Sequence, residues 1–302
     1  MSKSTLKLFG SPRISYDGSP VNIPRRKSIA LLAYLAANGP SSRQSLATLL
    51  WPDAASDRAL ANLRNALHAF NNTPLKESIV ADRNAVWLRT ESLDIDLQEF
   101  HFLVDTVDMN QLTRAVDLYS GPFLDGFSVR DSALFEQWQM QETRFLHQSC
   151  ITVLNRLFDH YEEQFQYDLA TACAMRITEM DNLDESAWRR LLKILALSGR
   201  KSEARTQYDN LIRILKTDLQ VLPEDETELL MNRIESGEFQ PVVCDKPQVT
   251  SSSQLPIPPT PFIGRRDDIS QIVELLLDPA HRLISLTGPG GTGKTRLALQ
   301  IA

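Results

Sequence analysis

The spacing of apolar residues changes twice within the first 92 residues, and this order most constrains the fold. Apolar and polar residues alternate between positions 5 and 23, which predicts strands joined by a tight turn at Asp17-Gly18. The spacing then becomes helical in three successive stretches and returns to short strands on both sides of residues 82–84. A sheet, three helices and a terminal hairpin in this order predict a winged helix-turn-helix over residues 1–92.

Capping signals predict the limits of the three helices. The first helix should end at Gly39, and the second should begin at Ser41, which forms a capping-box pattern with Gln44. The third should begin with Ser56 as its N-cap. Its predicted core stripe consists of Leu60, Leu63, Leu67 and Phe70.

Charge is distributed unevenly along the chain. Residues 1–90 contain 12 Lys and Arg against 5 Asp and Glu, a net charge of +7, whereas the remainder contains 20 against 33, a net charge of −13. A basic N-terminal part on an acidic body indicates a polyanionic partner at that end. Chance variation in composition is the alternative.

The third predicted helix has an exposed face suited to reading DNA bases. Asp57 is the only acidic residue between positions 54 and 72, and the face opposite Leu63 carries Arg, Asn and His. Arg pairs with guanine and Asn with adenine through two hydrogen bonds each. A plain solvated face is the alternative, although such a face more often carries Glu and Lys. The predicted base-reading residues are Arg58, Asn62, Asn65 and His68.

Phosphate contacts are expected from basic residues around this helix, because contacts to the DNA backbone do not depend on sequence. Arg25 and Arg43 also stand near predicted helix N-termini, whose free amides attract phosphate. For Arg83, at the hairpin tip, an ordinary turn residue is an equal alternative. The predicted phosphate contacts are Arg25, Arg26, Lys27, Arg43, Arg64 and Arg83.

Residues 97–238 are helical by pattern and contain a weak internal repeat. Ala170 and Ala204 each follow a short turn, and the distance between them in sequence equals that between Ile177 and Leu211. This distance is the period of tetratricopeptide repeats, which are pairs of antiparallel helices. Because two matches are few, an ordinary helical bundle is the alternative.

The C-terminal part contains a linker and a phosphate-binding motif. Residues 239–261 are rich in Pro and Ser, which predicts an extended linker. Residues 262–302 then begin a P-loop domain, since an apolar strand precedes the glycine-rich motif and a helix follows it. The predicted nucleotide-binding residues are Gly288, Gly290, Gly291, Gly293, Lys294 and Thr295.

The P-loop domain is expected to be incomplete in this chain, because only the start of its first helix follows the motif. We therefore expect no enzymatic activity and no required cofactor. An intact longer version would bind ATP and Mg²⁺ through this motif. The sequence has no apolar run long enough to span a membrane and no signal-peptide pattern, which predicts a cytoplasmic protein without a membrane partner. Three widely spaced cysteines predict reduced thiols and no metal site.

Several segments together resemble the SARP-type (AfsR/DnrI-like) bacterial transcriptional activators. The resemblance implies an OmpR-type winged helix, then a tetratricopeptide-like bacterial transcriptional activator domain, then the start of a STAND-type ATPase domain. The expected fold is thus mainly α, with a small α+β domain first and an incomplete α/β segment last. The segments are IPRRK at 23–27, LLWPD at 49–53, ANLRNAL at 61–67, AVDLYSGPFLDGF at 115–127 and FIGR at 262–265.

The resemblance also implies a function. Members bind promoter DNA in a sequence-specific way, often at direct repeats, and recruit RNA polymerase holoenzyme. The expected partners are therefore double-stranded promoter DNA, RNA polymerase holoenzyme and further copies of this chain on DNA. Two alternatives stay open: a nucleotide-dependent STAND switch with vestigial DNA binding, and a tetratricopeptide-like scaffold that binds proteins.

Overall fold

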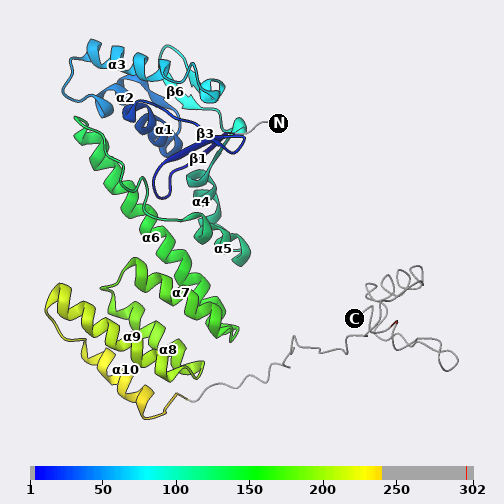
Figure 1. Ribbon diagram of the computed structural model, residues 1–302, viewed down its shortest axis with the longest axis vertical. Helices are drawn as coiled ribbons and strands as arrows, with labels where there is room; N and C mark the ends of the chain where they lie inside the picture. Colours follow the sequence, from blue (N-terminus) through cyan, green and yellow to red (C-terminus); the bar gives the residue numbers. More distant parts are fainter. Residues whose placement is uncertain (1–3, 240–296, 298–302) are drawn as a thin grey trace. The chain divides into compact units, whose positions relative to one another are not determined.

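A computed structural model of the chain describes residues 4–239 and residue 297. The chain divides into two compact units, Met1–Val242 and Val243–Ala302, and the helices and strands from Ser4 to Glu235 belong to the first (Figure 1). The predicted linker from residue 240 onward and the whole phosphate-binding motif, including Lys294 and Thr295, lie outside the described residues. The predictions made for them therefore stay predictions.

The N-terminal strands form a four-stranded sheet in the order β3-β2-β1-β7. Strands β1 and β2 are antiparallel with Leu6 opposite Ile14, and Asp17 and Gly18 have positive φ values of 46° and 77° in the turn that follows β2. The predicted tight turn is therefore confirmed. Strand β7 pairs parallel to β1 and extends this sheet beyond residue 92, which the sequence did not predict. The strands are β1 Ser4–Lys7, β2 Arg13–Tyr16, β3 Ser19–Pro20 and β7 Leu93–Ile95.

Three helices and a hairpin lie between β3 and β7 in the chain and form the predicted winged helix-turn-helix. Leu63 and Phe70 are buried in the core, as expected, whereas Leu60 and Leu67 are only half-buried at its margin. The hairpin strands belong to a second sheet in the order β4-β6-β5. These elements are α1 Arg26–Asn38, β4 Ser41–Ser42, α2 Arg43–Leu50, α3 Ser56–His68, a 3₁₀ helix Pro74–Ser78, β5 Ile79–Ala81 and β6 Ala85–Leu88.

Two predicted helix starts are wrong by one residue. Ser42, rather than Ser41, caps α2, since its hydroxyl accepts a hydrogen bond from the Ser45 amide at 3.0 Å. Ser41 is instead paired with Val86 in the second sheet, so the extended chain continues one residue further. Ser56 is the first residue of α3 and not its N-cap. The first displacement reflects a contact with a segment that is distant in sequence.

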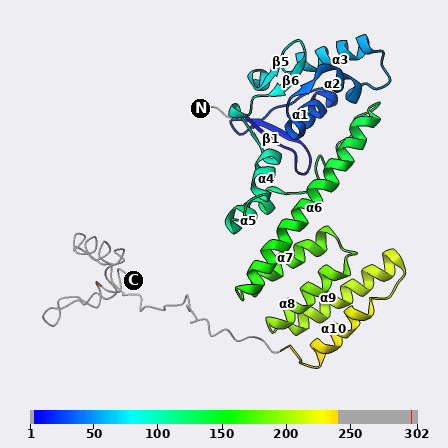
Figure 2. The ribbon, with the colours of Figure 1, turned by 180° about the vertical axis from the view of Figure 1, so that it is seen from behind.

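The helical part is built on the N-terminal part and shares its core. Helix α6 contacts α2, α4, α5 and α7, and both ribbon views show it passing beside them (Figures 1 and 2). The Asp96 carboxylate accepts hydrogen bonds from the amides of Leu8 and Phe9 at 2.9–3.1 Å. The Leu124 amide donates to the Leu8 carbonyl at 2.9 Å. The first helices here are α4 Asp96–Val104, α5 Met109–Leu118 and α6 Ala133–Glu163.

Helices α7 and α9 begin one predicted period apart, at Tyr167 and Lys201, whereas the starts of α8 and α10 are further apart. Ala170 and Ala204 are both the fourth residue of their helices, and both are completely buried. Thus the two helical pairs begin in the same way, as the tetratricopeptide-like prediction requires, and the predicted all-helical fold of this part is confirmed. The helices are α7 Tyr167–Met180, α8 Glu185–Leu197, α9 Lys201–Ile214 and α10 Asp225–Glu235.

The repeat extends to the turns that precede α7 and α9. Phe165 and Gly199, which are separated by the same period, both have left-handed backbones, with φ values of 56° and 77°. The next amides, those of Gln166 and Arg200, each donate to the carbonyl five residues earlier at 2.8 Å. This is the hydrogen bond that closes a Schellman helix end. Among the described residues, no helix is both long and apolar enough to cross a membrane.

Candidate nucleic-acid interface

Helix α3 presents the predicted base-reading side chains on its outer face. Arg58, Asn65 and His68 are exposed and Asn62 is half-buried, while Leu63 is buried. His68 Nδ1 lies 2.8 Å from the side-chain amide nitrogen of Asn71, which can only donate, so Nε2 is the ring nitrogen left for another partner. The geometry thus leaves all four predicted residues on or beside one accessible surface.

One side of α3 faces the hairpin, and we call this side the wing flank. Arg43, Arg64 and Arg83 line a shallow hollow there, together with residues of the hairpin turn. An adjoining hollow adds Lys76, from the 3₁₀ helix, to Arg43, Arg64 and His68. The structure therefore brings the three predicted arginines together. Lys76 was not predicted, although a lone lysine between α3 and the hairpin was visible in the sequence.

Asp82 fixes the hairpin turn on the wing flank. Its carboxylate accepts hydrogen bonds from the amides of Asn84 at 2.7 Å and Ala85 at 2.6 Å. These bonds, with that from Ala85 first, hold the pKa of Asp82 below its usual value. Its backbone carbonyl accepts from Arg43 Nε at 2.7 Å. The turn that carries Arg83 is thus organised locally, by residues near it in the hairpin and at the start of α2.

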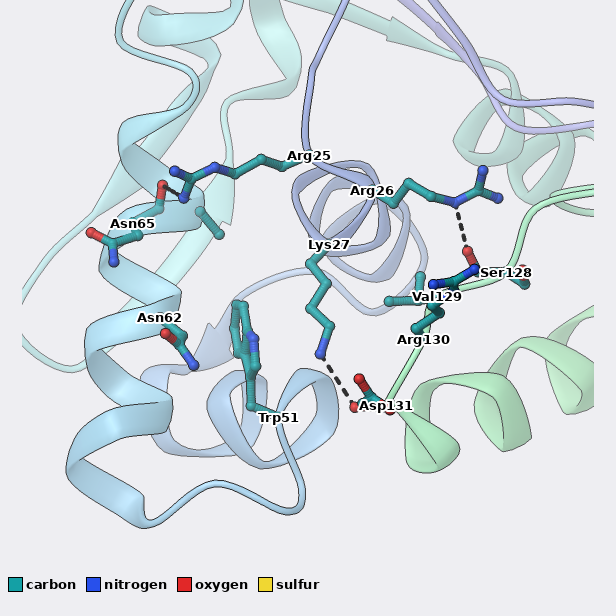
Figure 3. A pocket seen from close by; sticks show the side chains of 11 residues that line it. Arg25, Arg26, Lys27, Trp51, Asn62, Asn65, Ser128, Val129, Arg130 and Asp131 are labelled. Carbon is teal, nitrogen blue, oxygen red and sulfur yellow. Dashed lines mark hydrogen bonds between the residues drawn. The ribbon is translucent and has the colours of Figure 1, made fainter.

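The opposite side of α3 faces the loop that precedes α6, and we call it the loop flank. A cavity there is lined by the start of α1, by α3 and by loop residues 128–131 (Figure 3). Arg25 Nη1 donates to the backbone carbonyl of Asn65 at 3.2 Å. The lining from α3 is Asn62, Asn65 and Ala66, so the cavity opens beside the predicted base-reading face.

On this flank, two residues that the sequence predicts as phosphate contacts, Arg26 and Lys27, already donate hydrogen bonds to backbone carbonyls. Arg26 Nε donates to the Ser128 carbonyl at 2.8 Å, and its guanidinium lies 4.8 Å from the centre of the Phe127 ring. Lys27 Nζ donates to the carbonyls of Leu50 at 2.6 Å and Asp131 at 3.2 Å. Burial lowers the pKa of Lys27, and the nearby charge of Asp131 opposes that shift. Both side chains therefore hold loop 128–131 against α1.

Sequence reasoning did not place loop 128–131 at this surface. The loop lies far along the chain from both α1 and α3, and only the fold brings them together. Arg130 in this loop is exposed and lines the cavity with Arg25 and Asn65. The available signal was weak: a single arginine just before a predicted helix in an acidic part of the chain.

Comparison with known proteins agrees with this architecture. Residues 106–235 match the family described as the bacterial transcriptional activator domain. Regulatory protein AfsR of Streptomyces griseus is 22% identical over 92% of this chain, and AfsR of Streptomyces coelicolor is 27% identical over 63%. Residues 106–235 are thus similar to the bacterial transcriptional activator domain, and the chain as a whole is similar to regulatory proteins of the AfsR kind. It spans 30% and 20% of the lengths of these two relatives.

A solved structure shows the same fold. Mycobacterium tuberculosis EmbR, in complex with a low-affinity phosphopeptide, matches with a TM-score of 0.53 and 20% sequence identity. The match covers 78% of this chain and 66% of that one. A winged helix followed by an all-helical activator domain is therefore an arrangement that this solved structure shares.

Proposed function

We propose that this chain is a sequence-specific DNA-binding transcriptional regulator that activates transcription from promoters. The observation that carries the proposal is the surface of α3, whose exposed Arg, Asn and His side chains lie between two flanks that both carry cations. The match of residues 106–235 to the bacterial transcriptional activator domain and the similarity to regulatory protein AfsR support the proposal. The basic net charge of the first 90 residues supplies the long-range attraction to DNA.

In this proposal α3 lies in the major groove, which is wide enough for one helix. Asn62 and Asn65 would each pair with the N6 and N7 edge of an adenine, and Arg58 with the O6 and N7 edge of a guanine. His68 would donate from Nε2 to a base acceptor. On the wing flank, Arg64 and Arg83 would contact phosphates, which fix the register of the helix on the duplex.

The helical repeats supply the surface for further partners. We propose that residues 106–235 contact RNA polymerase holoenzyme and that copies associate on DNA. Large apolar side chains of this part are exposed, among them Leu222 at 77% and Leu229 at 61%, and such residues suit protein contacts. ATP and Mg²⁺ bound at the predicted phosphate loop would regulate this association; that motif lies outside the described residues.

Selection from genomic DNA tests the proposal. The purified chain is incubated with sheared DNA of its own genome at physiological salt, and the retained fragments are sequenced. We expect enrichment of a few upstream regions that share a short motif. Uniform retention of all fragments, or none, would contradict site-specific binding and favour the protein-binding scaffold.

The role of α3 is tested on the enriched site. Asn65→Ala should weaken binding there by about 1–3 kcal/mol and change binding to random DNA little, because one base contact is lost. Asn110→Ala, an exposed asparagine at the start of α5, is the matched control and should leave both affinities unchanged. Equal losses on specific and random DNA would contradict base reading by Asn65.

A further inference from the structure

We propose that Arg130, a residue of the activator domain, binds a backbone phosphate of the DNA held by α3. The DNA-binding surface would then be composite, with the winged helix supplying one flank and the activator domain part of the other. The inference deepens the proposed function and rests on it. Arg130 was not among the residues that the sequence predicts for this surface.

The first observation is the position and availability of Arg130. It is exposed and lines the same cavity as Arg25, Asn62 and Asn65 (Figure 3). Within residues 4–239, its guanidinium makes no hydrogen bond and no ion pair. All its donors are therefore available for a ligand beside the base-reading face.

The second observation is that the backbone around Arg130 is held in place. Val129 and Ser132, on either side, are both buried. The Ser132 hydroxyl donates to the Leu50 carbonyl at 2.7 Å, at the last residue of α2. Arg26 and Lys27 hold the carbonyls of residues 128 and 131. The loop thus places the Arg130 side chain beside the helix-turn-helix at little further entropic cost on binding.

The third observation is the unequal supply of free cations on the two flanks. A helix in the major groove lies between the two backbone strands, so it has the phosphates of a different strand on each side. The wing flank offers Arg64 and Arg83, whereas on the loop flank Arg25, Arg26 and Lys27 each already donate to a backbone carbonyl. Arg130 adds a guanidinium without such a bond within residues 4–239, and a guanidinium matches the geometry of a phosphate.

One neighbouring charge opposes this binding. The Asp131 carboxylate also lines the cavity and would repel a phosphate. It lies close enough to the Lys27 ammonium to oppose the fall in the pKa of that lysine, so part of its charge is balanced there. The net effect still leaves the Arg130 guanidinium without an acidic partner.

The test compares Arg130→Ala with Arg144→Ala, which removes an exposed arginine from α6. Affinities for the enriched site and for random DNA are measured between about 50 and 200 mM salt. Arg130→Ala should weaken both and lower the slope of log K against log salt by about 0.9. The ratio of wild-type to variant affinity should then fall by a factor of about 3.5 across this range. Arg144→Ala should match the wild type.

Further outcomes separate this inference from the proposed function. Arg130→Lys should keep most of the salt slope, and the melting temperature of Arg130→Ala should equal that of the wild type, because no intramolecular partner is lost. An unchanged slope in Arg130→Ala, with specific binding still lost in Asn65→Ala, would overturn the inference and leave the proposed function standing. Absence of DNA binding by the wild type would overturn both.

Discussion

The two flanks of α3 carry similar charges but are built in different ways. On the wing flank, Arg43, Arg64 and Arg83 belong to the helix-turn-helix and its hairpin, and Arg43 and Asp82 organise the turn locally. On the loop flank, Arg26 and Lys27 hold a segment much further along the chain, just before α6. The same residue types thus face solvent on one side and join two domains on the other.

This difference shows what decides the role of a basic side chain. Arg64 is exposed and makes no hydrogen bond among the described residues, so its removal should affect only binding. Lys27 is half-buried and donates to two carbonyls, so two of its three donors are already used. A cation whose donors are taken by carbonyls contributes to folding, and a cation without partners is available to phosphate.

The largest effect should follow from breaking the contacts between Asp96, the first residue of α4, and the segment that follows β1. Asp96→Ala would leave the amides of Leu8 and Phe9 without their acceptor at the junction. Unsatisfied buried donors cost about 1–3 kcal/mol each, so we expect a loss of about 3 kcal/mol in the free energy of unfolding. Urea denaturation measures it.

Asp96→Asn is the matched variant for this prediction. It keeps one carbonyl oxygen at the same position, so it should lose clearly less stability than Asp96→Ala. Equal stability of Asp96→Ala and the wild type would contradict the structural role of the junction.

A smaller and more direct comparison uses one arginine from each flank. Arg26→Ala should lower the free energy of unfolding by about 1 kcal/mol through its bond to the Ser128 carbonyl, with the salt slope of DNA binding unchanged. Arg64→Ala should leave stability unchanged and lower the slope by about 0.9. Denaturation and salt titration of both variants measure this: each variant should change one of the two quantities and leave the other unchanged.

Either variant can contradict the comparison. If Arg26→Ala lowers the salt slope as much as Arg64→Ala does, Arg26 contacts a phosphate, as the sequence predicts. If Arg64→Ala destabilises the protein, the wing flank is not a purely solvent-facing surface. The free energy of unfolding and the salt slope together show whether each arginine stabilises the fold or binds a phosphate.

The elements of the fold were predictable from sequence because they depend on local signals. The turn at Asp17-Gly18 needs left-handed backbone, and the repeat at Ala170 and Ala204 needs a small residue where helices pack. The position of Leu63 in the buried stripe of α3 likewise fixed which residues face outward. The turn and the helix stripe act within a few residues, and the repeat is visible because the same pattern occurs twice in the sequence.

The features of the site that the sequence did not predict depend on contacts between residues that are distant in sequence. Ser41 was expected to cap α2, but its pairing with Val86 moved the cap to Ser42. In the same way, no local pattern indicates that Arg130 lines the same cavity as Asn65, because the fold places loop 128–131 across that cavity from α3 (Figure 3). Charge patterning found the basic residues, and only the fold shows which of them are already engaged.

The smallest expected effect concerns the response of the two flanks to pH. The pKa of Asp82 is held low by amide hydrogen bonds, so its contribution to stability is present above the unfolded pKa of about 3.9 and is lost as pH falls through the folded value. The amide NMR shifts of Asn84 and Ala85 should therefore titrate with a midpoint below about 3.9. On the loop flank Arg26 and Lys27 donate to carbonyls and not to Asp82, so the Asp82→Asn variant should leave the amide shift of Val129 unchanged. Asp82→Asn should abolish the titration at Asn84 and Ala85, and a titration that persists there would show that another group organises the turn.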